Sequence, residues 1–269
     1  MTAAAAERTV DAFLAGRMEA VQPAHGHHRS GLEALLLAAS VDSDFAGNVI
    51  DLGAGAGVAG MAIAARCPQA NVVLVEREAE AIACAREALE RPANARFRAR
   101  VSIVAADVAA PEAERVAAGI AREASDLVVM NPPFRDAGAG TPSPNAARRA
   151  AHVLPGGVEP WVRAAASALK AGGQLVVIFR ADGLAEVLSA LDGRFGGAAV
   201  LPIHPRTQLP AIRVIVSAVK GHRGALRLLP GLTLHGATSG TYLPEAERIL
   251  REGASIAEVH PSWAGVERG

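Results

Sequence analysis

The sequence predicts an α/β domain built on a mostly parallel sheet of seven strands. Short apolar runs alternate with helical patterns from residue 48 to residue 191, as in strands joined by crossover helices. The last two apolar runs, residues 198–203 and 211–218, are separated by a segment too short for a helix. These two runs must therefore form an antiparallel hairpin beside the parallel strands.

The remaining elements follow from the same patterns. Strands are expected at residues 48–52, 71–76, 101–104, 126–130 and 174–179. Helices are expected at residues 32–40, 78–89, 112–124, 159–170 and 183–191, with another ending near residue 67. Residues 9–18 are expected to form a short helix or turn, residues 242–250 a short helix, and the chain from about residue 255 to be poorly ordered.

Composition limits the classes of function. Of the 269 residues 51% are hydrophobic, so the chain can bury a sizeable core, and its formal net charge of zero gives no overall field toward a polyanion. The two cysteines, Cys67 and Cys84, lack metal-like spacing and fit a reducing compartment. No run is long enough to cross a membrane and no apolar signal segment follows the start, so we expect a cytoplasmic protein.

A polar segment with three histidines precedes the first predicted helix. His25, His27 and His28 lack a carboxylate or thiolate partner at ligand spacing, so we expect no metal there. Ser30 and Glu33 then have the spacing of a capping box, which predicts the helix start.

A glycine-rich loop follows the first strand. Glycines let the backbone turn sharply and let a ligand approach. Gly55, Gly57 and Gly60 fit the G-x-G-x-x-G pattern of dinucleotide sites, whereas Asp51, Gly53, Gly55 and Gly57 fit D-x-G-x-G-x-G. Either frame predicts a nucleoside-containing cofactor at the carboxyl end of this strand.

Two further acids follow the next two strands. Glu76 ends the second strand and is placed to accept both ribose hydroxyls of an adenosine, although it could instead cap the next helix. Asp107 follows the third strand and can accept from an adenine amino group while the N–H of Val108 donates to the ring. The alternative for Asp107 is an ordinary loop residue.

The fourth strand ends in an unusual turn, Asn131-Pro132-Pro133-Phe134. The prolines fix the backbone and stiffen the turn. The Asn131 side-chain oxygen and the Pro132 carbonyl can accept two N–H bonds, and the Phe134 ring can stack on a flat group. The turn therefore predicts a planar substrate with an amino group, against the alternative of a plain loop with a capping Asn.

Two later stretches carry positive charge. Residues 135–151 are rich in Gly, Pro, Ser and Thr, contain Arg148 and Arg149, and are expected to be a lid or an exposed loop. From residue 193 to residue 244 the chain has no Asp or Glu but six Lys and Arg residues, among them Arg206 and Arg223. This predicts a local basic surface for a phosphate backbone, unless these charges are merely scattered and solvated.

These motifs together resemble the amino-group methyltransferases of the class I S-adenosylmethionine (SAM) fold. The stretches that carry the closer resemblance are Gln22-Pro23, Gly26 to Arg29, Leu35 to Ala38, residues 204–206, 228–232 and 242–246. They are similar to the tRNA1(Val) adenine-N6 methyltransferase family, with His28 where that family usually has Tyr. The resemblance implies a Rossmann-like seven-stranded class I methyltransferase sheet, SAM as cofactor, and N6-methylation of adenine 37 of valine tRNA.

On this basis we predict three parts: a covering segment at residues 1–47, a methyltransferase domain at 48–220, and an extension packed on it at 221–269. The predicted cofactor-binding residues are Arg29, Asp51, Gly53, Gly55, Glu76, Asp107, Val108 and Asn131. The predicted catalytic residues are Asn131, Pro132 and Phe134, and the substrate-binding residues are Pro133, Phe134, Arg148, Arg149, Arg206 and Arg223. RNA is the expected partner, with no membrane and no metal.

Several functions remain compatible with the sequence. The same turn serves methylation of a ribosomal RNA or DNA base or of a protein glutamine, because each offers an NH2 group. A nicotinamide-dependent oxidoreductase would use the other glycine frame, but the terminal hairpin is foreign to the six-stranded dinucleotide fold. A third class is a non-catalytic RNA-binding protein. Neither the RNA and nucleotide nor the oligomeric state is encoded in these motifs.

Overall fold

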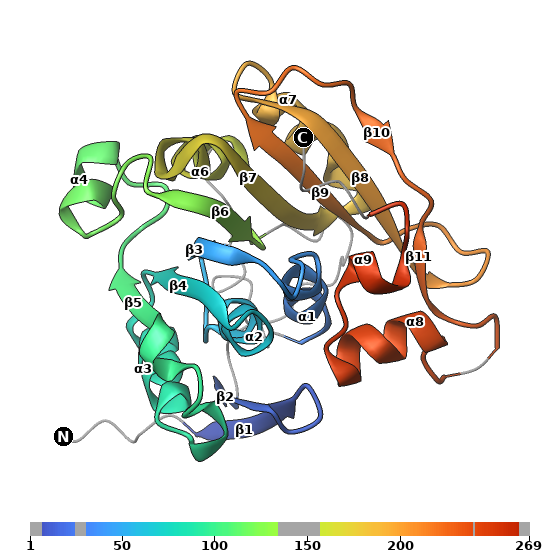
Figure 1. Cartoon of the computed structure of the whole chain (residues 1–269), viewed down its shortest axis with the longest axis horizontal. Helices are drawn as coiled ribbons and strands as arrows, with labels where there is room; N and C mark the ends of the chain where they lie inside the picture. The colour runs from blue at the N-terminus through green and yellow to red at the C-terminus, as the bar shows by residue number, and fades with distance from the viewer. Residues whose placement is uncertain (1–6, 25–30, 134–156, 239, 264–269) are drawn as a thin grey trace, which may run out of the picture.

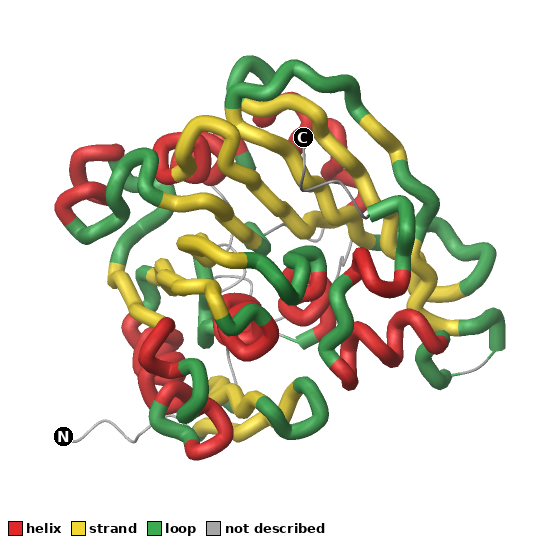
Figure 2. The backbone as a smooth tube through the Cα atoms, viewed as in Figure 1, coloured by secondary structure: helices red, strands yellow, loops and turns green. Residues whose placement is uncertain are grey.

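The computed structural model describes residues 7–24, 31–133, 157–238 and 240–263. One large sheet crosses the molecule, and helices cover both of its faces (Figure 1). The tube in Figure 2 shows the same arrangement, with the strands enclosed by helices on either side. Two buried apolar clusters, one on each face, form the core.

The seven predicted strands are present in the order β8-β9-β7-β6-β3-β4-β5. Their bounds are β3 Ala46–Leu52, β4 Gln69–Glu76, β5 Val101–Ala105, β6 Ser125–Met130, β7 Leu169–Arg180, β8 Phe195–Arg206 and β9 Arg213–Lys220. Strand β9 runs antiparallel to both β7 and β8, whereas β3 pairs in parallel with β4 and β6. The predicted α/β class and its antiparallel hairpin are therefore confirmed.

Two short strands extend this sheet beyond the prediction. β10 Arg227–Leu228 and β11 Leu232–His235 both pair in parallel with β8. Most backbone groups of an edge strand lack partners on one side, and a following segment can satisfy them without strong strand propensity of its own. For this reason the sequence pattern did not mark β10 and β11 as strands.

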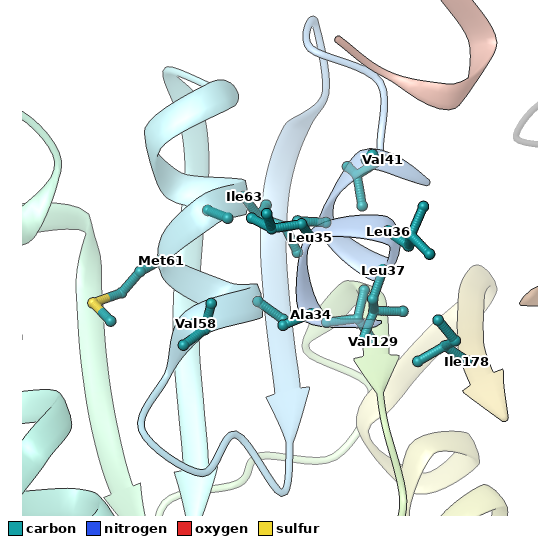
Figure 3. Close-up of a cluster of buried hydrophobic side chains, with 14 of the residues drawn as sticks. Ala34, Leu35, Leu36, Leu37, Val41, Val58, Met61, Ile63, Val129 and Ile178 are labelled. Carbon is teal, nitrogen blue, oxygen red and sulfur yellow. The ribbon is translucent and has the colours of Figure 1, made fainter. Parts of the chain in front are cut away.

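Helices α1 Leu32–Ala39, α2 Val58–Arg66 and α3 Ala79–Leu89 contribute to one core cluster. Helices α6 Glu159–Ala168 and α7 Leu184–Leu191 contribute to the cluster on the other face. Figure 3 shows Leu37 of α1 beside Val129 of β6, and Ile63 of α2 beside Leu35 of α1. Short 3-10 helices lie at η1 Pro92–Asn94, η2 Arg98–Arg100 and η3 Ala181–Gly183.

Two helix predictions need correction. Helix α4 spans only Glu112–Ala117 instead of residues 112–124, because Gly119 turns the backbone into the left-handed region with φ +110°. The N-cap residue of helix α1 is Gly31 and not Ser30, and no side chain of the described residues caps it. Ser30 itself lies outside the described residues.

The N-terminal segment is a β-hairpin: residues 14–17 form a turn, one of the two predicted alternatives, but the residues on either side are strands and not a short helix. Strands β1 Arg8–Phe13 and β2 Met18–Pro23 pair antiparallel in a separate two-stranded sheet. Three residues of β2, Met18, Ala20 and Val21, are fully buried, and β2 contacts α3. Burial of this face against helices outweighs the helix propensity of the local sequence.

Residues 255–263 are ordered, contrary to the prediction, and residues 264–269 lie outside the described residues. Ser255 caps α9 Ile256–Val259 through a capping box with Glu258, and α8 Pro244–Glu247 and the π-helix η4 Arg248–Glu252 precede it. Trp263 is fully buried, and its indole Nε1 donates to the carbonyl of Ser40 at 3.1 Å. Burial of a large aromatic side chain, worth about 1.5–3 kcal/mol, anchors this segment.

No helix among the described residues is long and apolar enough to cross a membrane. Cys67 and Cys84 are both buried in the core as thiols and not joined in a disulfide.

Candidate active site at the carboxyl edge of the sheet

Parallel pairing brings four predicted site residues to one edge of the sheet. Asp51 lies near the end of β3, Glu76 ends β4, Asp107 follows β5 and Asn131 follows β6. Strands β4 and β6 flank β3, and β5 flanks β4, so these four strand ends are consecutive neighbours. Their carboxyl ends lie at the same edge, which in open α/β sheets is where ligands bind.

The glycine loop after β3 adopts a conformation that requires glycine. Gly53, Gly55 and Gly57 have φ values of +70°, +57° and +83°. A Cβ on Gly57 would lie 2.7 Å from a methyl carbon of Leu74, and one on Gly60 only 2.3 Å from the other methyl carbon. The backbone angle at Gly57 therefore favours glycine, and a side chain at Gly57 or Gly60 would require the buried Leu74 methyl groups to move.

Glu76 holds this loop in place. Its Oε2 accepts the N–H of Gly55 at 2.8 Å, and its Oε1 accepts the N–H groups of Arg77 and Glu78 at 2.8 and 2.9 Å. Helix α3 has no side-chain cap at its N-cap residue, Glu78, so Glu76 is not an N-cap. The carboxylate faces the glycine loop, as a ligand to ribose hydroxyls would.

Asp51 is buried beside this network. Its side chain is 2% exposed, and its Oδ2 accepts the N–H of Gly60 at 2.9 Å. Burial raises the pKa of Asp51 to about 7; the Gly60 hydrogen bond opposes this shift, and the nearby Glu76 carboxylate adds to it.

Asp107 lies at the next strand end, and both oxygens of its carboxylate already have partners within the protein. Its Oδ1 accepts the N–H of Ala109 at 2.8 Å, and its Oδ2 pairs with the Arg77 guanidinium at 3.1 Å. The side chain of Asp107 is 43% exposed, whereas Val108 is buried. Arg77 was not among the predicted site residues, although its position directly after Glu76 places it at this edge.

The Asn131 turn presents an acceptor without a donor. The Asn131 Oδ1 is buried and has no hydrogen-bond partner among the described residues. Pro132 is buried and Pro133 is half-buried. Buried polar atoms nearly always have partners, so an exception at a strand end beside a glycine loop is a mark of a binding site. Phe134, Arg29, Arg148 and Arg149 lie outside the described residues.

The structure separates the two remaining predicted residues. Arg206 ends β8, which runs parallel to β7, so it lies toward the same edge as Asn131. Arg223 follows β9, whose direction is opposite, and therefore lies toward the other edge. The Arg206 Nη1 donates to the carbonyl of Gly236 at 3.3 Å.

In the folded protein, acids from other parts of the chain lie beside several positive charges of the acid-free stretch, residues 193–244. Three of its cations pair with acids from elsewhere in the chain: Arg194 with Glu159, Arg213 with Glu33, and Lys220 with Glu123. The N···O distances of these pairs are 2.9, 3.1 and 3.1 Å. Composition along one segment therefore overstates the local charge. Within the described ranges no group of three or more His, Cys, Asp or Glu residues could hold a metal ion.

Comparison with known proteins gives one matching family. Residues 25–204 match the model described as the methyltransferase small domain. The chain is also similar to a solved structure described as a predicted O-methyltransferase from Agrobacterium tumefaciens, with 38% identity, 82% of this chain, 97% of that chain and a TM-score of 0.71. A 16S rRNA N2 G1207 methyltransferase of T. thermophilus, solved with AdoMet and guanosine, shares the fold at 22% identity and a TM-score of 0.55, over 82% of this chain and 52% of that one.

Curated relatives act on different molecules. The chain is 34% identical to a tRNA1(Val) (adenine(37)-N6)-methyltransferase of Porphyromonas gingivalis over 39% of this chain and 41% of that one. It is 32% identical to ribosomal RNA small subunit methyltransferase C of Actinobacillus succinogenes over 62% and 41%, and 33% identical to the release factor glutamine methyltransferase of Chlorobaculum tepidum over 62% and 56%. The chain thus spans less than two thirds of each of these relatives. It belongs to the methyltransferase small-domain family, a family of S-adenosylmethionine-dependent methyltransferases.

Proposed function

We propose that this enzyme methylates an amino nitrogen of an RNA base, most specifically N6 of adenine 37 in valine tRNA. The observation that carries the proposal is the Oδ1 of Asn131 at the end of β6, which is buried and has no partner within residues 7–24, 31–133, 157–238 and 240–263. An acceptor of this kind suits a substrate that brings N–H groups. The methyltransferase of Porphyromonas gingivalis whose name specifies adenine(37)-N6 supports the choice of nucleotide.

Asn131 and Pro132 account for the chemistry on the substrate side. The amino nitrogen of adenine is a weak nucleophile because its lone pair is delocalised into the ring. In the proposal, the Asn131 Oδ1 and the Pro132 carbonyl accept its two N–H bonds, which favours a more tetrahedral nitrogen. Positive charge that grows on this nitrogen then faces two fixed acceptors, so they stabilise the transition state more than the ground state. When bound, SAM supplies the electrophilic methyl group.

We assign the cofactor to the glycine loop and the neighbouring acids. The positive φ angles of Gly53 and Gly55 and the inward-facing carboxylate of Glu76 fit a nucleoside cofactor. We infer that Asp51, Asp107, Val108 and Asn131 complete this site together with Arg29. For Asp107 the cofactor must share or displace the Arg77 guanidinium, which now pairs with its Oδ2.

The substrate side is proposed from Phe134, for stacking on the base, with Pro133, Arg148 and Arg149. Arg206, at the edge of Asn131, is proposed to contact the RNA backbone near the reacting base. Arg223, at the other edge, is proposed to contact a more distant part of the same RNA. The target base must leave its stack to reach the turn, which favours a loop nucleotide.

The second candidate function is methylation of a protein glutamine. Its support is the similarity to the release factor glutamine methyltransferase of Chlorobaculum tepidum, together with the two N–H donors of an amide NH2 group.

One experiment separates these functions. Purified enzyme is incubated with methyl-labelled SAM and, in parallel, with tRNA, ribosomal RNA and total protein from cells that lack its gene. We expect label in tRNA, recovered as N6-methyladenosine after digestion to nucleosides. Label in protein alone, recovered as methylglutamine, would contradict the RNA proposal.

A further inference from the structure

Trp161 contacts the glycine loop from one face of the sheet, and Leu74 contacts it from the other face. It lies in the first turn of α6 and is 8% exposed. A Cβ on Gly53 would lie 2.3 Å from Cη2 and 2.6 Å from Cζ3 of its indole ring. The benzo edge of the indole therefore rests directly against the backbone of the first glycine of the loop.

Helix α6 is itself fixed at this end. The N–H of Val158 donates to Oε1 of Glu186 at 2.8 Å, and Arg194 pairs with Glu159 at 2.9 Å. Val158 and Trp161 belong to the same buried cluster as Met130, the last residue of β6. The indole is thus held on a rigid element and cannot swing away from the loop without disturbing the core.

The loop is consequently held on two sides. Leu74, in the other core cluster, leaves no space at Gly57 and Gly60, while Glu76 binds the N–H of Gly55. At Gly53, which follows β3 directly, the three atoms nearest to such a Cβ all belong to the Trp161 indole. Without it, the first residue of the loop would lose its packing partner, although the hydrogen bond to Glu76 would remain.

We propose that Trp161 is a positioning residue of the cofactor site: its indole fixes the backbone of Gly53 and so keeps the glycine loop in the conformation that binds SAM. This inference depends on the SAM assignment of the family and not on which molecule accepts the methyl group. A preformed loop avoids the ordering cost that a mobile loop meets on binding. Loss of the indole should therefore weaken cofactor binding more than turnover.

The chain provides a direct spectroscopic test, because Trp161 and Trp263 are its two tryptophans. Trp263 is fully buried in the C-terminal segment and hydrogen-bonded to Ser40, away from the glycine loop. The Trp263→Phe variant leaves Trp161 as the single emitter. We expect its emission to change on titration with SAM, and the Trp161→Phe variant to show no change. A single-tryptophan Trp161 protein that binds SAM with unaltered emission would overturn the proposal.

Affinity gives the second readout. By calorimetry, we expect the SAM dissociation constant of Trp161→Leu to rise at least about tenfold, a loss of about 1.4 kcal/mol, and that of Trp161→Phe to rise about threefold or less. At saturating SAM, kcat of Trp161→Leu should stay within about fivefold of wild type. The matched control is Trp263→Phe, which should bind SAM as wild type does.

A purely structural role gives a different pattern. In that case Trp161→Leu and Trp263→Phe would both lower Tm, and neither would change the SAM affinity of the folded protein. If Trp161→Leu does not fold, emission and calorimetry on Trp161→Phe and Trp263→Phe distinguish the positioning role from a purely structural one. Equal SAM affinity and an equal emission response in these two variants would refute the positioning role.

Discussion

The glycine loop and the Asn131 turn lie at neighbouring strand ends, yet their polar groups are in opposite states. At the loop, Glu76 accepts the N–H of Gly55 and those of Arg77 and Glu78 after β4, and Asp51 accepts the N–H of Gly60 in α2. In the turn, the buried Oδ1 of Asn131 accepts none from the part of the chain that the structure describes. The loop is thus organised by contacts within the chain, whereas the turn keeps an acceptor suited to a ligand with N–H groups.

The energetic consequence differs between the two regions. A buried acceptor without a partner costs about 1–3 kcal/mol of stability. Removing such a group from the turn should not destabilise the fold, whereas removing an acceptor from the loop should. Substitution of Asn131 is therefore expected to lower activity without lowering stability, whereas substitution of Glu76 is expected to lower both.

The largest effect is expected for Asn131→Ala. Loss of the acceptor should lower kcat about 1,000-fold, about 4 kcal/mol in the transition state, because one preoriented group facing developing charge is removed. SAM affinity by calorimetry should fall far less than kcat does, because Asn131 is only one of several residues assigned to the cofactor, and Tm should not fall. Asn48→Ala, at the exposed start of β3, is the matched control and should keep full activity. Activity of Asn131→Ala within about tenfold of wild type would contradict the acceptor role.

The next effect concerns pH and Asp51. Its pKa in the folded state is about 7, above the value of 3.8 for the unfolded chain. Between these values the folded state binds the proton more tightly, so the stability from this group is complete below about pH 4 and is lost as the pH rises to about 7. From about pH 5 to pH 7 the loss amounts to at most about 3 kcal/mol.

Denaturant unfolding of wild type and Asp51→Asn over this pH range measures that loss. Asparagine does not titrate, so the free energy of unfolding of wild type should fall relative to that of Asp51→Asn as the pH rises. Parallel pH curves for the two proteins would show that Asp51 ionises at the same pH in both states. The paired surface acids Asp126 and Glu258, whose pKa values are lowered by hydrogen bonds and partner charges despite partial burial, are unchanged in the variant and cancel in the difference.

Glu76→Ala should affect both affinity and stability. Three backbone N–H groups lose their acceptor, so we expect Tm to fall by an amount equivalent to about 1–3 kcal/mol. SAM affinity should fall about tenfold or more, since the loop loses its tie to β4. Glu78→Ala is the control, because the Glu78 side chain is exposed and caps no helix. An unchanged Tm with lost SAM affinity would mean that Glu76 acts on the cofactor alone.

The smallest effects are expected for the two arginines. Arg206→Glu should weaken RNA binding about tenfold and reduce the slope of log affinity against log salt by about 1, since Arg206 lies toward the edge of Asn131. Arg223→Glu, at the opposite edge, should have a smaller effect on a short RNA stem-loop than on a whole tRNA. Filter binding at several salt concentrations measures both. Equal losses for both variants on the short RNA would remove the distinction between the two edges.

Several features followed from the sequence because they are local. The residues that produce each of these features lie within a short stretch of sequence. The features are the strands formed by continuous apolar runs, the glycine loop, the stiff Asn131 turn and the short link before β9. Parallel pairing then brings Asp51, Glu76, Asp107 and Asn131 to one edge, as the alternation of strands and helices predicted.

Only the tertiary structure decided the rest, because those contacts join residues far apart in the chain. Trp263 reaches Ser40 across 223 positions, which orders a segment expected to be poorly ordered. Glu33 pairs with Arg213 across 180 positions and reduces the charge of the acid-free stretch. Trp161, in helix α6, contacts Gly53, which follows strand β3 much earlier in the chain. Such contacts depend on the shape of the packed core, in which the neighbours of an element determine how it is buried. The conformations of the glycine loop and the Asn131 turn depend instead on the backbone preferences of glycine and proline, which each short segment carries by itself.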